Sequence, residues 1–355
     1  MLLKTLIALC TVFTNLAISV LASGSGRRAD TSTCSPETAA VRQEWGDMTD
    51  PQRTAYIDAV LCLMSTPSVY SPGVVPGAKS HFDDFMAVHI NNTLTIHISG
   101  IFLPWHREFV RLYEQALQQK CIGTGPGGRR SLRALSSTAA PPPSPATVLT
   151  MRHRVLTRLP KAFTSPRGTG GGCVTGGPFV NHTINFGPFS TNDAFEGILP
   201  ANWQDYTPHC FVRDLNDYVA NMYGNTTIVD ALLAASTIAE FQGNMTGYPA
   251  TLAGLGPHPG IHISLGWALQ DFFASPGDPA FYLHHGMVDR TWALWQEMDP
   301  ENRQTALNGT ASLGNPVTSP VVTLDTVVEW GPLGPAKTVG ELMDIMSGEY
   351  CYRYV

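Results

Sequence analysis

The sequence predicts one mainly α-helical domain, and three observations lead to this prediction. Several segments place apolar residues at helical spacing, and several begin with a capping residue followed by proline. Long stretches rich in Gly and Pro connect these segments, and no internal repeat is found. Of the 355 residues, 43% are hydrophobic and 14% are charged, so a large core can form. A net charge of −6 without a long basic run argues against a nucleic-acid partner.

The first 22 residues are typical of a secretory signal peptide. Lys4 precedes a mostly apolar run over residues 6–21, and small residues near Ser23 suit cleavage. The run is short, and no later stretch approaches the ~20 apolar residues that span a bilayer. We therefore expect residues 1–22 to be removed, residues 23–355 to form one domain, and the protein to be secreted without further membrane contact.

The cysteines and glycosylation motifs agree with export. Six cysteines remain once Cys10 leaves with the signal peptide, and an even set in an exported chain suggests up to three disulfides. The spacing leaves their pairing open. No CxxC pair occurs, so a cysteine zinc site is not expected. Five N-x-[ST] motifs fit a glycoprotein; they start at Asn91, Asn181, Asn225, Asn244 and Asn308.

Four helices are expected in the N-terminal third. Ser35 and Asp50 each precede a proline, which is typical of a helix start. The helix that starts at Asp50 covers residues 50–63 with apolar residues on one face. The next helix covers residues 81–93, and the fourth covers residues 101–117. Residues 123–192 contain few regular signals.

Three helical regions are expected in the C-terminal half. Helical patterning covers residues 214–235, and another helix begins at about His258. The last clear helix covers residues 279–298, with Asp278 as its N-cap and proline at its first position. The tail is mostly loop, with short strands such as residues 321–324.

One expected helix carries a histidine where a core residue belongs. His106, Val110, Tyr113 and Leu117 share one stripe of the helix over residues 101–117. A lone buried histidine is usually neutral and hydrogen-bonded. A different role is indicated only if other histidines converge on the same place.

Two groups of three histidines meet that condition. His258 and His262 are four residues apart and so face one side of a helix, and His285 leads a second apolar stripe. No histidine has a glutamate three residues before it, so the di-iron pattern is absent, and imidazole-only ligation suits copper or zinc. Two metal sites are predicted, although His-x3-His also occurs in ordinary helices. The groups are His89, His97 and His106, and His258, His262 and His285.

Two long segments resemble the copper motifs of the tyrosinase family. "HISGIFLPWHREFVRLYE" over residues 97–114 resembles the first motif, and "DPAFYLHHGMVD" over residues 278–289 resembles the second. The flanking "FDDFMAVHI" and "RTWALWQ" are similar to short fungal members, and the resemblance covers residues 34–121 and 171–355. It implies a helical bundle around two copper ions of a type-3 centre, which use dioxygen to oxidise small phenols.

The resemblance also implies roles for individual residues. His89, His97 and His106 would hold one copper, and His258, His262 and His285 the other, with no catalytic residue beyond these ligands. In "LHH" the family pattern assigns the ligand to His285, and the alternative assigns it to His284.

Histidine ligands need partners that fix their tautomers, and Asp289 is the candidate partner. It would act through a pair with Arg107 or Arg290. The alternative for this aspartate is a plain salt bridge on the helix surface.

Two departures from the family bear on the reaction. Many relatives carry a cysteine, cross-linked to a copper ligand, where this chain has Thr95, so no thioether can form. Relatives that hydroxylate monophenols often have an asparagine where this chain has Pro259, which has no N–H donor and no side-chain acceptor. Both departures favour oxidation of o-diphenols to o-quinones over hydroxylation of monophenols. Monophenol hydroxylation and o-aminophenol oxidation remain the alternatives.

A third departure lies in residues 122–163. Relatives place core-forming aromatic residues there, whereas this stretch has six arginines, no acidic residue and no aromatic residue before Phe163. We interpret it as a misread reading frame or a retained intron; a genuine surface insertion is the alternative. The chain ends directly after "YCYRY", so no C-terminal lid domain is expected. The competing functional classes are oxygen binding of the hemocyanin type and an inactive copy.

Overall fold

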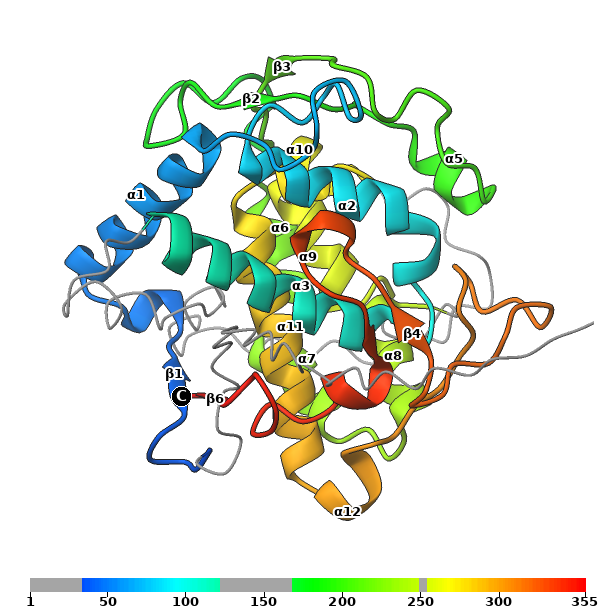
Figure 1. The fold of residues 1–355 in the computed structure, drawn as a ribbon. Coiled ribbons are helices and arrows are strands. Elements are labelled where there is room, and N and C mark those ends of the chain that lie inside the picture. The colour runs from blue at the N-terminus through cyan, green and yellow to red at the C-terminus, as the bar shows by residue number, and fades with distance from the viewer. Residues whose placement is uncertain (1–33, 122–167, 249–253) are drawn as a thin grey trace, which may run out of the picture.

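The fold is described from a computed structural model, which defines residues 34–121, 168–248 and 254–355. Helices dominate these residues, as predicted, and α2, α3, α9 and α11 lie at the centre of the molecule (Figure 1). The α-helices are α1 (Asp50–Ser65), α2 (His81–Ile96), α3 (Phe102–Ala116), α5 (Thr191–Phe195), α6 (Asp217–Tyr223), α7 (Thr226–Leu233), α8 (Ile238–Thr246), α9 (Pro257–Leu265), α10 (Trp267–Gln270), α11 (Ala280–Glu297) and α12 (Pro300–Arg303).

Short strands and turns complete the described structure. A π-helical turn, η3 (Leu117–Cys121), continues α3, and 3-10 turns lie at η2 (Trp45–Asp47), η4 (Ser275–Gly277), η5 (Gly331–Leu333) and η6 (Val339–Leu342). The strands form three two-stranded sheets, in which β1 (Ala40–Arg42) pairs in parallel with β6 (Tyr352–Tyr354), β2 (Thr183–Ile184) pairs antiparallel with β3 (His209–Cys210), and β4 (Val327–Val328) pairs antiparallel with β5 (Lys337–Thr338).

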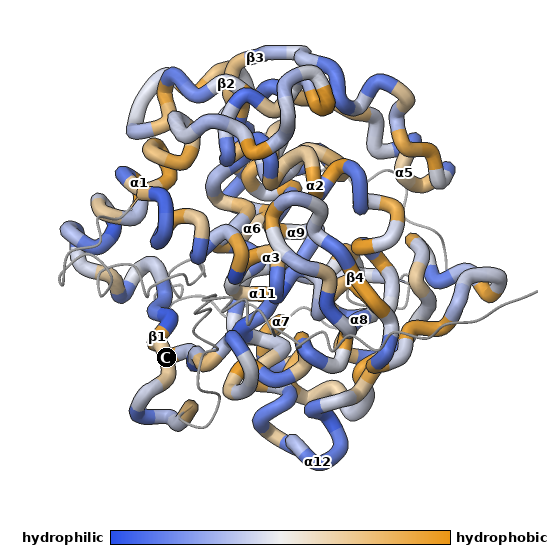
Figure 2. The backbone as a smooth tube through the Cα atoms, viewed as in Figure 1, coloured by the Kyte–Doolittle hydropathy of each residue, from blue (hydrophilic) through white to orange (hydrophobic). Residues whose placement is uncertain are grey.

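The core forms where α2, α3 and α11 pack together. All four residues of the stripe that begins at His106 are buried, because α3 is covered on more than one side. Tyr113 of α3 stacks on Tyr282 of α11 with ring centroids 3.4 Å apart. In contrast, α12 at the edge of the molecule is hydrophilic along its length (Figure 2). Within the described residues, no helix has the length and apolar character needed to cross a membrane.

Several predicted elements differ from the structure, beyond the few residues by which α1 and α2 extend past their predicted ends. No helix begins at Ser35, because its N–H donates to Thr38 Oγ1 and local bonds of this kind compete with a helix. The region over residues 214–235 contains two helices, since Asn225 accepts from the N–H of Ile228 and starts α7. The helix predicted over residues 279–298 is α11, which begins one residue later than predicted, at Ala280, with Pro279 at its N-cap position. Residues 321–324 form no strand beyond a single bridge between Val321 and Thr310.

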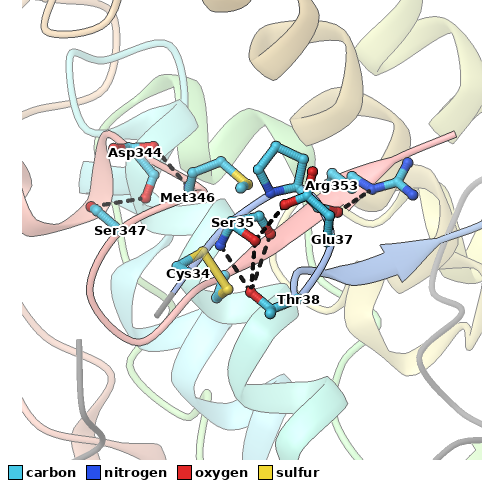
Figure 3. Close-up of a disulfide and its surroundings, with 10 residues drawn as sticks. Cys34, Ser35, Glu37, Thr38, Asp344, Met346, Ser347 and Arg353 are labelled. Atoms are coloured by element: carbon cyan, nitrogen blue, oxygen red, sulfur yellow. Dashed lines mark hydrogen bonds between the residues drawn. A yellow bond between two sulfur atoms is a disulfide. The ribbon is translucent and has the colours of Figure 1, made fainter. Parts of the chain in front are cut away.

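Three disulfides hold the described segments together. Cys34 pairs with Cys351, next to a turn in which the Ser35 hydroxyl bonds to Glu37 (Figure 3). This disulfide lies beside the β1–β6 pair and so joins the two ends of the described chain. The other two disulfides are Cys62–Cys121, which links α1 to η3, and Cys173–Cys210. The predicted signal peptide and the atypical segment over residues 122–163 lie outside the described residues.

Candidate metal centre

Three histidines converge from α2 and α3. His89 lies in α2, His97 is the C-cap residue of the same helix, and His106 lies in the first turns of α3. One ring nitrogen from each lies within 4.8 Å of the others, and all three side chains are buried. The three members of the first predicted group therefore do meet.

A second group comes from α9 and α11. His258 and His262 lie one turn apart on α9, and His284 and His285 lie on α11. One ring nitrogen from each of the four lies within 4.8 Å of the others. The structure thus brings the second predicted group together and adds His284 to it.

The two groups share one space. The rings of His106 and His285 stack with centroids 4.4 Å apart, and the rings of His97 and His258 are 6.4 Å apart. Two metal ions held by these groups would therefore be neighbours, as a dinuclear centre requires.

Backbone carbonyls orient four of the imidazoles. The Nδ1–H groups of His97 and His106 donate to the carbonyl oxygens four residues earlier in the chain, over 3.0 and 2.9 Å. The Nδ1–H groups of His89 and His262 donate to the carbonyls of Phe273 and Leu269, over 2.7 and 2.6 Å. In each neutral ring the Nε2 lone pair is then free to bind a metal.

Unpaired nitrogens show that a cation fits between the groups. The Nε2 atoms of His89, His106 and His258 are buried and have no hydrogen-bond partner among the described residues. Nε2 of His262 lies 3.4 Å from Nε2 of His285. Buried acceptors without a donor are costly, and a bound metal ion would remove that cost.

Burial keeps these imidazoles neutral. It lowers the pKa of His97 and of His262 to about 4, although a hydrogen bond to a backbone carbonyl raises each pKa in part. Burial, together with the neighbouring imidazoles, lowers the pKa of His89 and His106 well below the ordinary value. Neutral imidazole is the form that binds metals, so the site is ready to bind one at neutral pH.

The neighbouring His284 has a different environment from His285. Its Nε2–H donates to the carbonyl of His258 over 3.0 Å, and its ring stacks on the ring of His258 at 5.5 Å. His285 instead packs between Phe281 and His106, with ring centroids 4.2 and 4.4 Å away. The Nε2 atom of His284 is thus occupied by a carbonyl, which leaves His285 as the better candidate for the ligand.

A cavity of about 350 Å³ opens beside the histidines. His97, His258 and His262 line one side of it, so a small molecule in the cavity reaches both groups. Phe272 lies on the same wall, with its ring 4.6 Å from the ring of His97. Pro259 lines the cavity next to His258.

A family model for the common central domain of tyrosinase matches residues 79–298, which include both histidine groups. The chain belongs to the tyrosinase family. Tyrosinase P from Aspergillus terreus is 45% identical over 325 residues, covering 88% of this chain and 91% of that protein. N-acetyl-6-hydroxytryptophan oxidase ivoB from Emericella nidulans is 40% identical over 347 residues, covering 92% and 95%.

A solved structure supports the same fold. The chain matches a polyphenol oxidase variant from Thermothelomyces thermophila with a TM-score of 0.74 and 35% identity, over 91% of this chain and 90% of that chain. Tyrosinase-family proteins are copper oxidoreductases that act on small phenols. The two histidine groups accordingly fit a type-3 dicopper centre, with dioxygen as co-substrate.

In this tyrosinase-family chain, Asp289 forms no hydrogen bond with an imidazole of the described residues. One oxygen accepts from Arg107 Nε over 2.6 Å, and the other accepts from Arg42 and from the hydroxyls of Tyr352 and Tyr354. The predicted pair with Arg107 is present, and it is buried, so it is not a salt bridge on the helix surface. Backbone carbonyls, and not Asp289, accept from the Nδ1–H groups of four of the imidazoles. Asp289 instead joins α11 to α3 through Arg107 and to the two terminal strands.

Sequence reasoning missed Arg42, which is buried at the centre of this network. Its guanidinium donates to Glu114 over 2.6 Å and lies 3.5 Å from the ring centroid of Tyr352. A lone arginine in a short strand gives no signal of burial in the sequence. The alternation in Tyr352, Arg353 and Tyr354 was the one available hint, because it places both tyrosines on one face of β6.

Proposed function

We propose that this chain oxidises o-diphenols to o-quinones with dioxygen. Two catechols and one dioxygen give two o-quinones and two waters, so no further reductant is needed. Pro259 is the observation behind this choice, since it stands beside His258 on the cavity wall without an N–H donor or a side-chain acceptor. A water that takes the proton from a monophenol has no partner at that position.

The six histidines have defined roles in this proposal. His89, His97 and His106 hold one copper ion, and His258, His262 and His285 hold the other. When bound, the copper pair takes electrons from the phenol and passes them to dioxygen. The chain keeps its imidazoles neutral by burial, and its carbonyl groups fix the direction of four rings. No other described residue is assigned a catalytic role.

The cavity supports a substrate-oxidising enzyme over an oxygen carrier. An oxygen carrier needs room for dioxygen alone, whereas a cavity of about 350 Å³ that reaches both groups admits an aromatic ring. The name of one relative also supports oxidation of a phenol over oxygen transport, because 6-hydroxytryptophan carries a phenolic hydroxyl; that compound has one hydroxyl, so the name does not bear on the choice of o-diphenols.

We also propose that the protein is a secreted glycoprotein. The three disulfides support an oxidising compartment. The side chains of Asn91, Asn181 and Asn308 are exposed, so a glycan at any of these motifs would meet solvent. Asn225 is half-buried and caps α7.

Oxygen uptake by the copper-loaded protein tests the proposed reaction. The matched substrates are 4-methylcatechol and p-cresol, which differ by one hydroxyl group. We expect the catechol to be oxidised at least about a hundredfold faster, which is the usual size of a general-base contribution. Hydroxylation of p-cresol at a similar rate and without a lag would contradict the proposal.

A further inference from the structure

A second hollow, of about 460 Å³, lies between α1, the start of α2 and the turn that precedes β2. It shares no described lining residue with the cavity beside the histidines. Leu61 and Met64 of α1, together with Phe179 of the turn, give it an apolar side. Asp83 and Asn185 are among its polar lining residues. A hollow of this size and composition is suited to a small polar molecule that also has an apolar face.

Asp83 places a buried carboxylate in the wall of this hollow. It is 2% exposed, and its Oδ2 atom accepts from four donors over 2.8 to 3.1 Å. The donors are the N–H groups of Lys79 and Ser80, the Ser80 hydroxyl and the Asn185 amide. None of these four bonds reaches Oδ1, so this oxygen is left to accept from a hydroxyl group in the hollow. Hydrogen bonds to a carboxylate are stronger than those between neutral groups.

An aromatic side chain beside a carboxylate and an amide is a combination that suits a sugar ring. One face of a pyranose presents C–H groups, which pack against apolar side chains, and its rim presents hydroxyl groups, which need hydrogen-bond partners. Phe179 supplies the aromatic ring, and Asp83 and Asn185 supply the polar groups. The hollow therefore has the chemistry of a carbohydrate site.

The glycosylation motif at Asn181 belongs to the same wall. Asn181 lines the hollow two residues after Phe179. The N–H of His182 donates to the carbonyl of Phe179 over 3.0 Å, so the motif lies on a tight turn directly before β2. The side chains of Asn181 and Thr183, which define the motif, are both exposed. A sugar attached to the Asn181 amide would therefore begin at the edge of the hollow.

The other four motifs differ from this one. Asn225 caps α7, and Asn244 is half-buried. Asn91 and Asn308 are exposed, but the threonines that complete their motifs are buried. None of these four asparagines lines the hollow. Asn181 thus belongs to the one motif with both side chains exposed, and it stands beside a site that suits a sugar.

We propose that Asn181 carries an N-linked glycan whose first sugars bind in this hollow, against Phe179 and Asp83. The glycan would then connect the turn before β2 to α1 and form part of the folded structure, in addition to its contact with solvent. The inference rests on the proposed secretion, because N-glycans are added to chains that enter the secretory pathway.

Mass spectrometry of glycopeptides tests occupancy in the full chain secreted by a yeast host. We expect most chains to carry a glycan at Asn181. Glycans at other motifs with an unmodified Asn181 would refute this inference and keep the proposed glycoprotein. A chain without a glycan at any motif would refute both.

Endoglycosidase H tests whether the sugars are bound, because it cleaves between the first two sugars of the glycan. Sugars that occupy the hollow must leave it before the enzyme can reach this bond. We expect cleavage at Asn181 to be at least about tenfold slower in the native protein than in the denatured protein. Equal rates in the two states would overturn the proposed binding.

Phe179→Leu locates the binding, since it removes the ring and keeps an apolar side chain. It should speed cleavage at Asn181 in the native protein by about three- to tenfold. Phe189→Leu is the matched control, because Phe189 is also half-buried but does not line the hollow. An unchanged rate in Phe179→Leu, or an equal increase in both variants, would refute the proposed location.

The melting temperature gives a second test that does not depend on Phe179. Asn181→Gln and Thr183→Ala both remove the glycan and should each lower the melting temperature by about 2 °C or more, whereas Thr183→Ser keeps the motif and should match the wild type. Asn91→Gln removes a motif away from the hollow and should also match it. A wild-type melting temperature in both glycan-free variants would overturn the structural role. Their oxygen uptake should be unchanged in either case, so the oxidase is tested separately.

Discussion

At the scale of single residues, the predicted histidines meet but their hydrogen-bond partners are unexpected. A metal ligand must be a particular side chain, so His106 and His285 could be found from spacing and from the two quoted segments. The partners of His89 and His262 are carbonyls of Phe273 and Leu269. Every residue has a carbonyl, so residue types could not reveal these contacts, and an aspartate was expected instead.

Pro259 gives a prediction at the same scale. Pro259→Asn would supply a side-chain acceptor and an amide donor next to His258, where a deprotonating water could be held. We expect the monophenol-to-catechol ratio of kcat/KM to rise by about tenfold, part of the full value of a general base. Oxygen uptake with p-cresol and 4-methylcatechol measures it.

Pro259→Ala is the matched control for this variant. It removes the proline ring without adding a polar side chain, so the ratio should stay near that of the wild type. An equal increase in both variants would show that the ring, and not the missing polar group, limits monophenol oxidation.

At the scale of elements, the helices were predictable and their connections were not. Residues 50–63 and 101–117 show clear helical spacing, and α1 and α3 are found there. The β1–β6 pair joins strands more than 300 residues apart, and Arg42 lies 247 residues from Asp289. Local patterns contain no information about such pairings.

Asp289→Asn tests how strongly the buried carboxylate of Asp289 holds α11 to α3 and to the β1–β6 pair. Its partners are Arg107, Arg42, Tyr352 and Tyr354. Arg42 and Arg107 would keep their buried charges without the carboxylate, which typically costs about 3–5 kcal/mol. The free energy of unfolding, from urea titration at neutral pH, should fall by that amount. Tyr354→Phe removes one hydrogen bond to the same carboxylate and should cost less, about 1.5–3 kcal/mol.

The difference in the free energy of unfolding between the wild type and Asp289→Asn should depend on pH through the pKa of Asp289. Burial raises this pKa, but the charges of Arg107 and Arg42 and the two tyrosine hydroxyls lower it below its ordinary value. The stabilisation is therefore complete above about pH 4 and is lost as the pH falls through the folded pKa. A difference between wild type and Asp289→Asn that already shrinks between pH 7 and pH 5 would contradict this assignment.

At the scale of the whole molecule, the sequence could not predict how the cysteines pair or whether residues 122–163 are genuine. Six cysteines predicted up to three disulfides, and three are present. Their pairing depends on which distant elements meet, so spacing could not supply it. The interpretation of residues 122–163 as a misread frame or a retained intron stays a prediction, because these residues lie outside the described part of the chain.

We expect the natural transcript to encode a different sequence over residues 122–163, one that contains aromatic residues. A chain that lacks buried aromatics beside the copper site would lose about 3–5 kcal/mol for each, against a total stability of about 5–15 kcal/mol. Sequencing the transcript checks this prediction. A transcript that encodes the segment as printed, together with a stable and active secreted product, would contradict it.

The copper content of single-histidine variants tests the central claim most directly. The wild-type protein should contain two copper ions per chain by elemental analysis, and His106→Ala and His285→Ala should each lose at least one. His284→Ala should keep both, because Nε2 of His284 is bonded to a backbone carbonyl. Two coppers retained in His106→Ala or in His285→Ala would contradict the assignment, as would a wild-type protein that binds no copper.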